Sequence, residues 1–158
     1  NLFSSCTALA SIYIPNTITT IGDEAFYNCT SLATIDIPAS VLSIGDWAFY
    51  SCNQLSSVNF TEGLYTIKDN AFYDCKNLTS ITLPNSVTHI GDWAFQNCSK
   101  LAYVQIDAIT PPAIGGTNIF ESTKIKSIHI PCGTIEAYEA SDWYDLELAF
   151  IEIGSKYV

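Results

Sequence analysis

The apolar residues of this chain recur with a period of 23 residues. A column of leucines keeps this spacing at Leu9, Leu32, Leu55, Leu78 and Leu101, and a column of cysteines keeps it at positions 6, 29, 52, 75 and 98. Four Ala-Phe pairs, beginning at positions 25, 48, 71 and 94, follow the same register. Because independent columns share one register, the pattern predicts a repeat protein whose units stack on one another.

Within one unit, the alternation of apolar and polar residues predicts a short strand. Ile35 and Ile37 flank Asp36 with the period of a strand that buries one face, and Pro38 ends the ladder because it has no N–H to donate. We expect the equivalent strands to start at each residue of the leucine column and at Ile125, and to form one parallel sheet.

The second half of the unit predicts another extended side and a turn. Val41 and Ile44 mark the extended side, and Gly45 permits a turn before Asp46, whose carboxylate is expected to cap a short helical turn at residues 47–49. One coil cannot bury its own apolar side chains, so neighbouring coils share a core at a strand spacing of about 4.8 Å. The sequence therefore predicts a β-rich, right-handed solenoid of short parallel strands, turns and short helical segments.

The repeats are expected to cover residues 1–131, with the first unit truncated and the last irregular, and residues 132–158 are expected to form a C-terminal cap. Thr61 and Lys68 replace the proline and the turn glycine of the third unit, so that coil is expected to be looser or Lys68 to be less strained. In the cap, Thr134 is the expected N-cap of a short helix, and three apolar side chains are expected to cover the last coil. These are Ile135, Tyr138 and Trp143. The chain begins inside a repeat, so the first coil is expected to be a weak edge.

These motifs resemble the BspA-like, or Treponema-type, leucine-rich repeats. The resemblance rests on Ile-Pro, on Ile-Gly-Asp-x-Ala-Phe and on the cysteine that follows. Thr110-Pro111-Pro112, the segment 130–134 and the cap aromatics also resemble the closing segment of Bacteroides-type surface proteins. The resemblance implies a leucine-rich-repeat solenoid from the surface or secreted proteins of host-associated microbes, and it carries no catalytic residue.

The charge of the chain narrows the range of partners. The formal net charge is −10, and all six positive side chains are lysines. Without arginine, the chain lacks the guanidinium group that usually makes paired hydrogen bonds to phosphate and guanine, so nucleic acid is not an expected partner. No apolar run approaches the roughly 20 residues of a membrane span, so no direct membrane insertion is expected.

The cysteine column predicts free thiols, and no cofactor or metal site is expected. Side chains stacked in register have parallel Cα–Cβ vectors, which favours unpaired thiols at Cys29, Cys52 and Cys75. A line of cysteines without histidine does not suit zinc. Cys132 and His129 could form a nucleophilic pair, although two residues that flank a proline at a strand end are more typical of a structural role.

The column of aspartates and the aromatic columns each allow two interpretations. Asp23, Asp46, Asp69 and Asp92 are expected to be turn caps, with calcium bridging as the alternative. Candidate binding residues are Tyr27, Tyr50, Tyr73, Trp47 and Trp93 on the turn side, and Tyr13, Tyr103 and His129 on the strand face. Exposed Tyr and Trp residues dominate binding hot spots, but the tyrosines could instead stack on one another as packing.

The sequence therefore favours a non-enzymatic, extracellular or cell-surface binding and adhesion module. Its expected partner is a protein or glycan on host or neighbouring cells. The alternative is a structural stalk that displays another domain.

Overall fold

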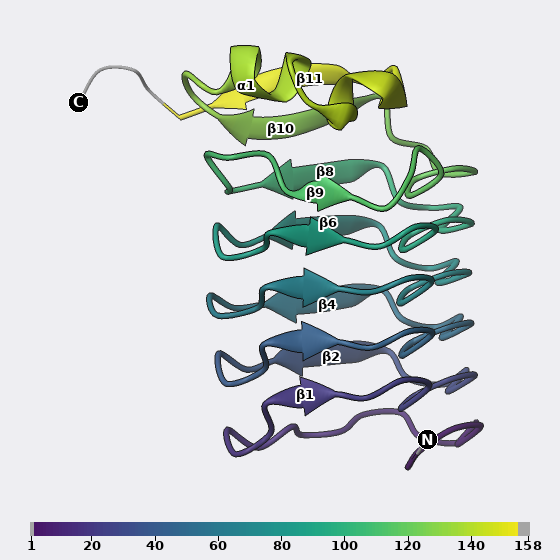
Figure 1. The fold of residues 1–158 in the computed structure, drawn as a ribbon. Coiled ribbons are helices and arrows are strands. Elements are labelled where there is room, and N and C mark those ends of the chain that lie inside the picture. The colour runs from purple at the N-terminus through teal and green to yellow at the C-terminus, as the bar shows by residue number, and fades with distance from the viewer. Residues whose placement is uncertain (1, 155–158) are drawn as a thin grey trace.

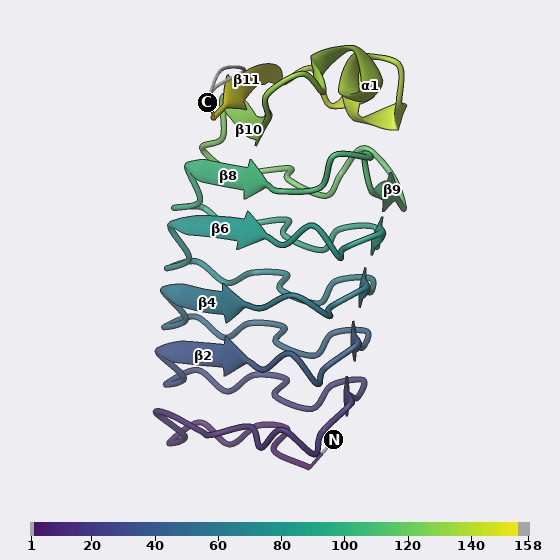
Figure 2. The ribbon, with the colours of Figure 1, turned by 90° about the vertical axis from the view of Figure 1, so that its left-hand side faces the viewer.

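Each 23-residue unit makes one turn around a common axis, and successive units stack along that axis (Figures 1 and 2). The computed structural model describes residues 2–154. A typical coil has three sides: a strand of four residues, a strand of two residues and a run of turns. The predicted right-handed leucine-rich-repeat solenoid is confirmed.

Two of the three sides are built from parallel strands. The longer strands are β2 (Thr34–Ile37), β4 (Ser57–Phe60), β6 (Ser80–Leu83), β8 (Tyr103–Ile106), β10 (Ser127–Pro131) and β11 (Ala149–Ile153). The two-residue strands β1 (Thr20–Ile21), β3 (Ser43–Ile44), β5 (Thr66–Ile67), β7 (His89–Ile90) and β9 (Ala113–Ile114) form one sheet in that order. Figure 2 shows the longer strands stacked on one side.

The longer strands differ from the prediction in three respects. They begin two residues after the leucine column, as at Thr34 after Leu32, and no strand follows Leu9. They form two ladders, β2–β4 and β6–β8–β10–β11, rather than one sheet, although β4 and β6 contact each other. The late start has a local cause, because the Leu32 N–H bonds to the Cys29 carbonyl at 3.1 Å and closes a turn there.

The core between the sides consists of aligned columns of side chains. Leu32, Leu55, Leu78 and Leu101 are completely buried. A column of phenylalanines runs through the centre, with neighbouring ring centroids 5.0–5.8 Å apart from Phe26 to Phe120. This distance is close to the spacing of paired strands, so the ring stack follows from the backbone register.

The irregular units remain part of the stack. Phe120 keeps its place in the phenylalanine column because extra residues enter the fifth unit, where the β7–β9 pairing joins residues 24 positions apart, as at Ile90 and Ile114. In the third unit, the Lys68 N–H lies 3.0 Å from the Ile44 carbonyl, against 2.8 and 2.7 Å at the equivalent Gly45 and Gly91. Lys68 therefore keeps the hydrogen bond of the glycines that it replaces, and its φ is not positive. The predicted looseness of the third coil stays a prediction.

The C-terminal segment covers the last coil with two aromatic rings. It contains α1 (Ile135–Glu139), the 3₁₀ helix η1 (Asp142–Leu146) and β11, which pairs with β10. Tyr138 and Trp143 are completely buried, and they donate 2.7 Å hydrogen bonds to the carbonyls of Ala108 and Pro112. Ile135 is only half-buried. The boundary between residues 131 and 132 stays a prediction, and residues 155–158 of the expected cap lie outside the described residues.

Thr134 occupies the predicted N-cap position of α1, but its side chain does not cap the helix. Its hydroxyl donates to the Pro131 carbonyl at 2.7 Å instead of accepting from the helix. Glu152 in β11 instead binds this end of the helix, because its Oε1 accepts from Ile135 N in the first turn at 3.1 Å and from Gly133 N just before the N-cap at 2.8 Å. Between residues 2 and 154, neither helix has the length and apolar character of a membrane span.

Candidate binding surface

The third side of the stack is a run of turns with its own hydrogen-bond pattern. We call this side the turn face, and it consists of residues 24–28, 47–51, 70–74 and 93–97. In the second coil, the N–H groups of Trp47, Phe49 and Ser51 donate to carbonyls of the next coil at 2.7–3.1 Å. The N–H groups of Ala48 and Tyr50 between them donate within their own coil. Alternate amides therefore hold the coils together and close the turns.

This alternation goes with a left-handed backbone at two positions in every coil. The first position holds Glu24, Trp47, Asn70 and Trp93, with φ of 53–57°. The second holds Asn28, Ser51, Asp74 and Asn97, with φ of 55–62°. The predicted helical turn at residues 47–49 is therefore wrong, because bonds between coils take the place of helical ones.

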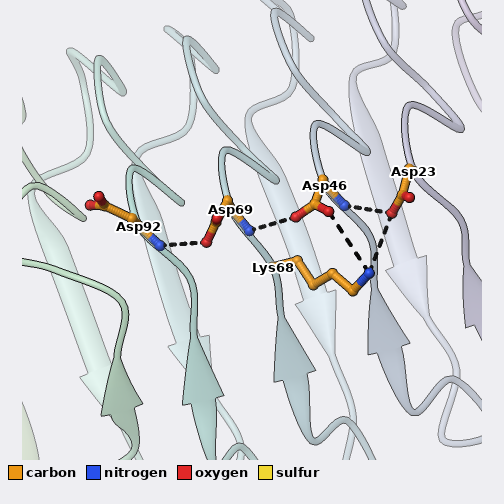
Figure 3. A network of polar contacts seen from close by, with 5 residues as sticks. All are labelled: Asp23, Asp46, Lys68, Asp69 and Asp92. Carbon is orange, nitrogen blue, oxygen red and sulfur yellow. Dashed lines mark hydrogen bonds and ion pairs between the residues drawn. The ribbon is translucent and has the colours of Figure 1, made fainter.

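The aspartate column lies where each coil enters the turn face (Figure 3). Oδ1 of Asp23, Asp46 and Asp69 accepts from the N–H of the next aspartate in the column, at 2.9, 3.1 and 2.9 Å. The expectation that each aspartate caps its own turn is thus wrong for these three, which cap the following coil. Asp92 does bond to its own turn, since Trp93 N donates to it at 3.0 Å.

Lys68 supplies a cation to this column, which sequence reasoning missed. Its Nζ lies 3.6 Å from Asp23 Oδ1 and 3.8 Å from Asp46 Oδ2 (Figure 3). Lys68 replaces the turn glycine of the repeat, and its side chain reaches back across two coils. The ion pairs are solvent-exposed, so their contribution to stability is small. Within residues 2–154, no three or more His, Cys, Asp or Glu side chains are grouped to hold a metal ion.

The tyrosine column is a stack of parallel rings. The rings of Tyr27 and Tyr50 are 4.9 Å apart with an interplanar angle of 3°, and those of Tyr50 and Tyr73 are 5.0 Å apart at 4°. The Tyr73 hydroxyl accepts a hydrogen bond from Asn97 Nδ2 at 2.9 Å. Burial, followed by the neighbouring tyrosines, raises the pKa of Tyr50 above its usual value of 10.0. The geometry of this column is that of the packing alternative.

The two turn-face tryptophans are more exposed than the tyrosines beside them. Trp47 is 42% exposed and Trp93 is 39% exposed. An open depression of about 420 Å³ lies against Trp47 and is lined by Glu24, Tyr27 and Tyr50. Aromatic and carboxylate groups therefore meet at one hollow on the turn face.

The strand-face candidates lie apart from the turn face, in two separate places. Tyr13 belongs to the first coil and is 80% exposed. Tyr103 in β8 stacks on His129 in β10, with ring centroids 4.4 Å apart, and donates to Gln105 at 2.9 Å. The eight candidate residues thus occupy three separate places rather than one continuous site.

The cysteine column is buried from Cys29 to Cys98, while Cys6 at its start is exposed. All six cysteines are free, and Sγ of Cys29, Cys52, Cys75 and Cys98 donates to a phenylalanine carbonyl of the preceding coil at 3.1–3.2 Å. Burial raises the pKa of Cys52 to about 12, and it raises the pKa values of Cys29 and Cys75 as well. The prediction of unpaired thiols is confirmed.

The chain matches the family model described as the BspA type leucine rich repeat region in six copies, over residues 1–112 and 27–142. This chain belongs to that family. A T. pallidum leucine-rich repeat protein shares 31% identity with a TM-score of 0.67, covering 73% of this chain and 54% of its own. A leucine-rich cell surface protein from Faecalibacterium prausnitzii shares 26% identity with a TM-score of 0.59, covering 72% and 39%. A leucine-rich repeat protein from Eubacterium ventriosum shares the fold, with a TM-score of 0.58 and 23% identity. The match covers 78% of this chain and 34% of that protein.

This BspA-type chain spans about half the length of the T. pallidum protein and less of the other two. None of the curated proteins compared with it matches. The family supports a protein-interaction or structural module, and leucine-rich repeat families are generally non-enzymatic.

The BspA-type framework and the candidate surface occupy different columns of the stack. The Leu, Phe and Cys columns repeat in nearly every coil and point inward. The first left-handed position of the turn face instead changes from Glu24 to Trp47, Asn70 and Trp93. Sequence reasoning missed Glu24 and Asn70. They could have been found because they stand 23 residues from the two tryptophans, in the same column.

Proposed function

We propose that this chain is a non-enzymatic binding module of a bacterial cell-surface or secreted protein, and that it contacts its partner through the turn face around Trp47 and Trp93. The family and the 26% identical F. prausnitzii protein, described as a cell surface protein, support an extracellular place. Adhesion to host or neighbouring cells is the role that we propose for this chain.

The carrying observation is the exposure of two tryptophan rings in a column of the turn face. Both have a left-handed backbone, with φ of 53° and 55°, and both leave about two fifths of their surface exposed. A non-glycine residue pays roughly 1–2 kcal/mol for this conformation, while asparagine tolerates it better. Asn70 occupies the same position between them with φ of 57°. The conformation is common to all of these coils, so the two positions are set apart by the large exposed rings that occupy them, and exposed tryptophans often dominate binding surfaces.

The test exchanges the tryptophans for the residue that the column already contains. A double variant, Trp47→Asn with Trp93→Asn, should still fold, because the phenylalanine core is untouched and the relief of backbone strain offsets part of the lost ring packing. Its binding to immobilised host matrix proteins and to cell-surface extracts should fall by about 1 kcal/mol or more for each ring that acts as a hot spot. Thermal unfolding and surface plasmon resonance provide the two measurements.

Tyr65→Ser is the matched control. Tyr65 is 51% exposed and lies outside the turn face, so its removal should leave binding unchanged. If the double variant binds its partner as the natural chain does, the turn face is not the contact surface. Binding by neither protein would instead favour the structural stalk.

A further inference from the structure

The turn-face tryptophans alternate with polar residues along the axis of the stack. One column reads Glu24, Trp47, Asn70 and Trp93, so that a tryptophan occurs in every second coil. The spacing of the coils can be taken from the adjacent tyrosine rings, whose centroids are 4.9 and 5.0 Å apart. Positions two coils apart, such as those of Trp47 and Trp93, are therefore separated by about 10 Å.

The surroundings of this column are polar rather than apolar. Asn70 lies between the tryptophans, the aspartate column runs along one side, and the tyrosine stack runs along the other. Asp74 and Asn97, on the far side of the tyrosines, are half-buried and add carboxylate and amide groups. The face thus mixes aromatic rings with carboxylates and amides, whereas the centre of a typical protein interface is depleted of charged residues.

Isolated aromatic rings set among carboxylates and amides suit a sugar. The C–H groups on one face of a pyranose ring stack on the electron-rich face of an indole. Its equatorial hydroxyls donate to carboxylates and bond with amides, as the groups around Asn70 provide. The net charge of −10 disfavours an anionic polysaccharide, which leaves a neutral one.

We propose that the turn face binds a neutral, linear β-1,4-linked glycan that runs along the solenoid axis, with alternate sugar rings on Trp47 and Trp93. Successive rings of such a glycan are turned over, so every second ring presents the same face. Two linked rings span close to the distance between the tryptophans. The ring between them lies over Asn70. This inference rests on the proposed function and names the ligand class of the same surface.

The experiment measures how binding depends on the length of the sugar. Probes are β-1,4-linked glucose and N-acetylglucosamine oligomers from disaccharide to hexasaccharide, with α-1,4-linked glucose oligomers, which coil, as the geometric control. Isothermal titration calorimetry gives affinity and stoichiometry. Fluorescence reports the exposed indoles, since the third tryptophan, Trp143, is completely buried. We expect β-linked tetrasaccharides to bind at least about tenfold more tightly than disaccharides, because they engage both rings.

Single variants test the two-site arrangement. Trp47→Asn and Trp93→Asn should each reduce tetrasaccharide affinity to about the disaccharide level and halve the number of disaccharide sites, while Tyr65→Ser leaves both unchanged. The proposal is overturned if no β-linked oligomer binds, if affinity does not rise with length, if α-linked oligomers bind equally well, or if the variants bind as the natural chain does. Loss of a protein partner in the double variant, without sugar binding by the natural chain, would refute the glycan and leave the proposed function standing.

Discussion

The turn glycines provide a stringent test of how closely the coils approach. In Gly91→Ala, the added Cβ would lie 2.4 Å from Asp69 N and 2.5 Å from the carbonyl carbon of Lys68, both backbone atoms of the preceding coil. The fourth coil would have to move. Overpacking of this kind costs about 1–3 kcal/mol. The shift would also weaken the 2.7 Å bond from Gly91 N to the Ile67 carbonyl, worth about 0.5–1.5 kcal/mol.

Gly22→Ala is the matched control, because the same column in the first coil has nothing within 4 Å of the added Cβ. There we expect no loss, and a gain of up to about 1 kcal/mol from the restricted unfolded chain. For Gly91→Ala, a total loss of about 2–4 kcal/mol predicts a Tm roughly 5–15 °C lower. Circular dichroism during heating and in urea measures both variants. Equal stabilities would show that the coils have room to spread and would refute the argument from close approach.

Three further results follow from buried and stacked groups. Folding raises the pKa of Cys52 from 9.0 to about 12. The free energy of unfolding should therefore be unaffected by this thiol below pH 9 and should fall by about 4 kcal/mol as the pH rises toward 12. Urea unfolding across this range should show a flatter pH profile for Cys52→Ala than for the natural chain. Tyr138→Phe leaves the buried Ala108 carbonyl without its donor and should destabilise by about 1–3 kcal/mol in urea, whereas Tyr144→Phe, at a ring 66% exposed, should not. Replacement of Tyr27, Tyr50 and Tyr73 by serine removes two stacked pairs and should lower stability by about 1–3 kcal/mol, and an unchanged Tm would show that the rings contribute no packing.

The solenoid and its core could be predicted because in-register stacking leaves its period in the sequence. A buried side chain such as Leu55 touches its equivalents in the coils on either side, so each column must keep one kind of residue. The unpaired thiols followed from the same register. Free cysteines at 29, 52, 75 and 98 are the direct consequence of parallel side-chain vectors.

The turn face could not be predicted in the same way, because its conformation is decided between coils. Asp46-Trp47-Ala48-Phe49 reads locally as a capped helical turn, but the Trp47 N–H bonds to the Asp69 carbonyl of the next coil. The Asp46 carboxylate likewise serves the next coil. At the C-terminus, the first helical N–H of α1 bonds to Glu152 rather than to the side chain of its N-cap residue, Thr134, because β11 brings a carboxylate from a distant part of the chain.

The hydrogen bonds that join the turn faces have an electrostatic consequence for the stack. From Phe3 to Asn97, the amides that cross between coils on this side all donate toward the C-terminal neighbour. Each peptide group is a dipole, and dipoles aligned head to tail add along an axis, as they do in an α-helix. The strand sides have only small net dipoles. One edge of the solenoid is therefore polarised along its length, with its negative pole toward the first coil and its positive pole toward the last.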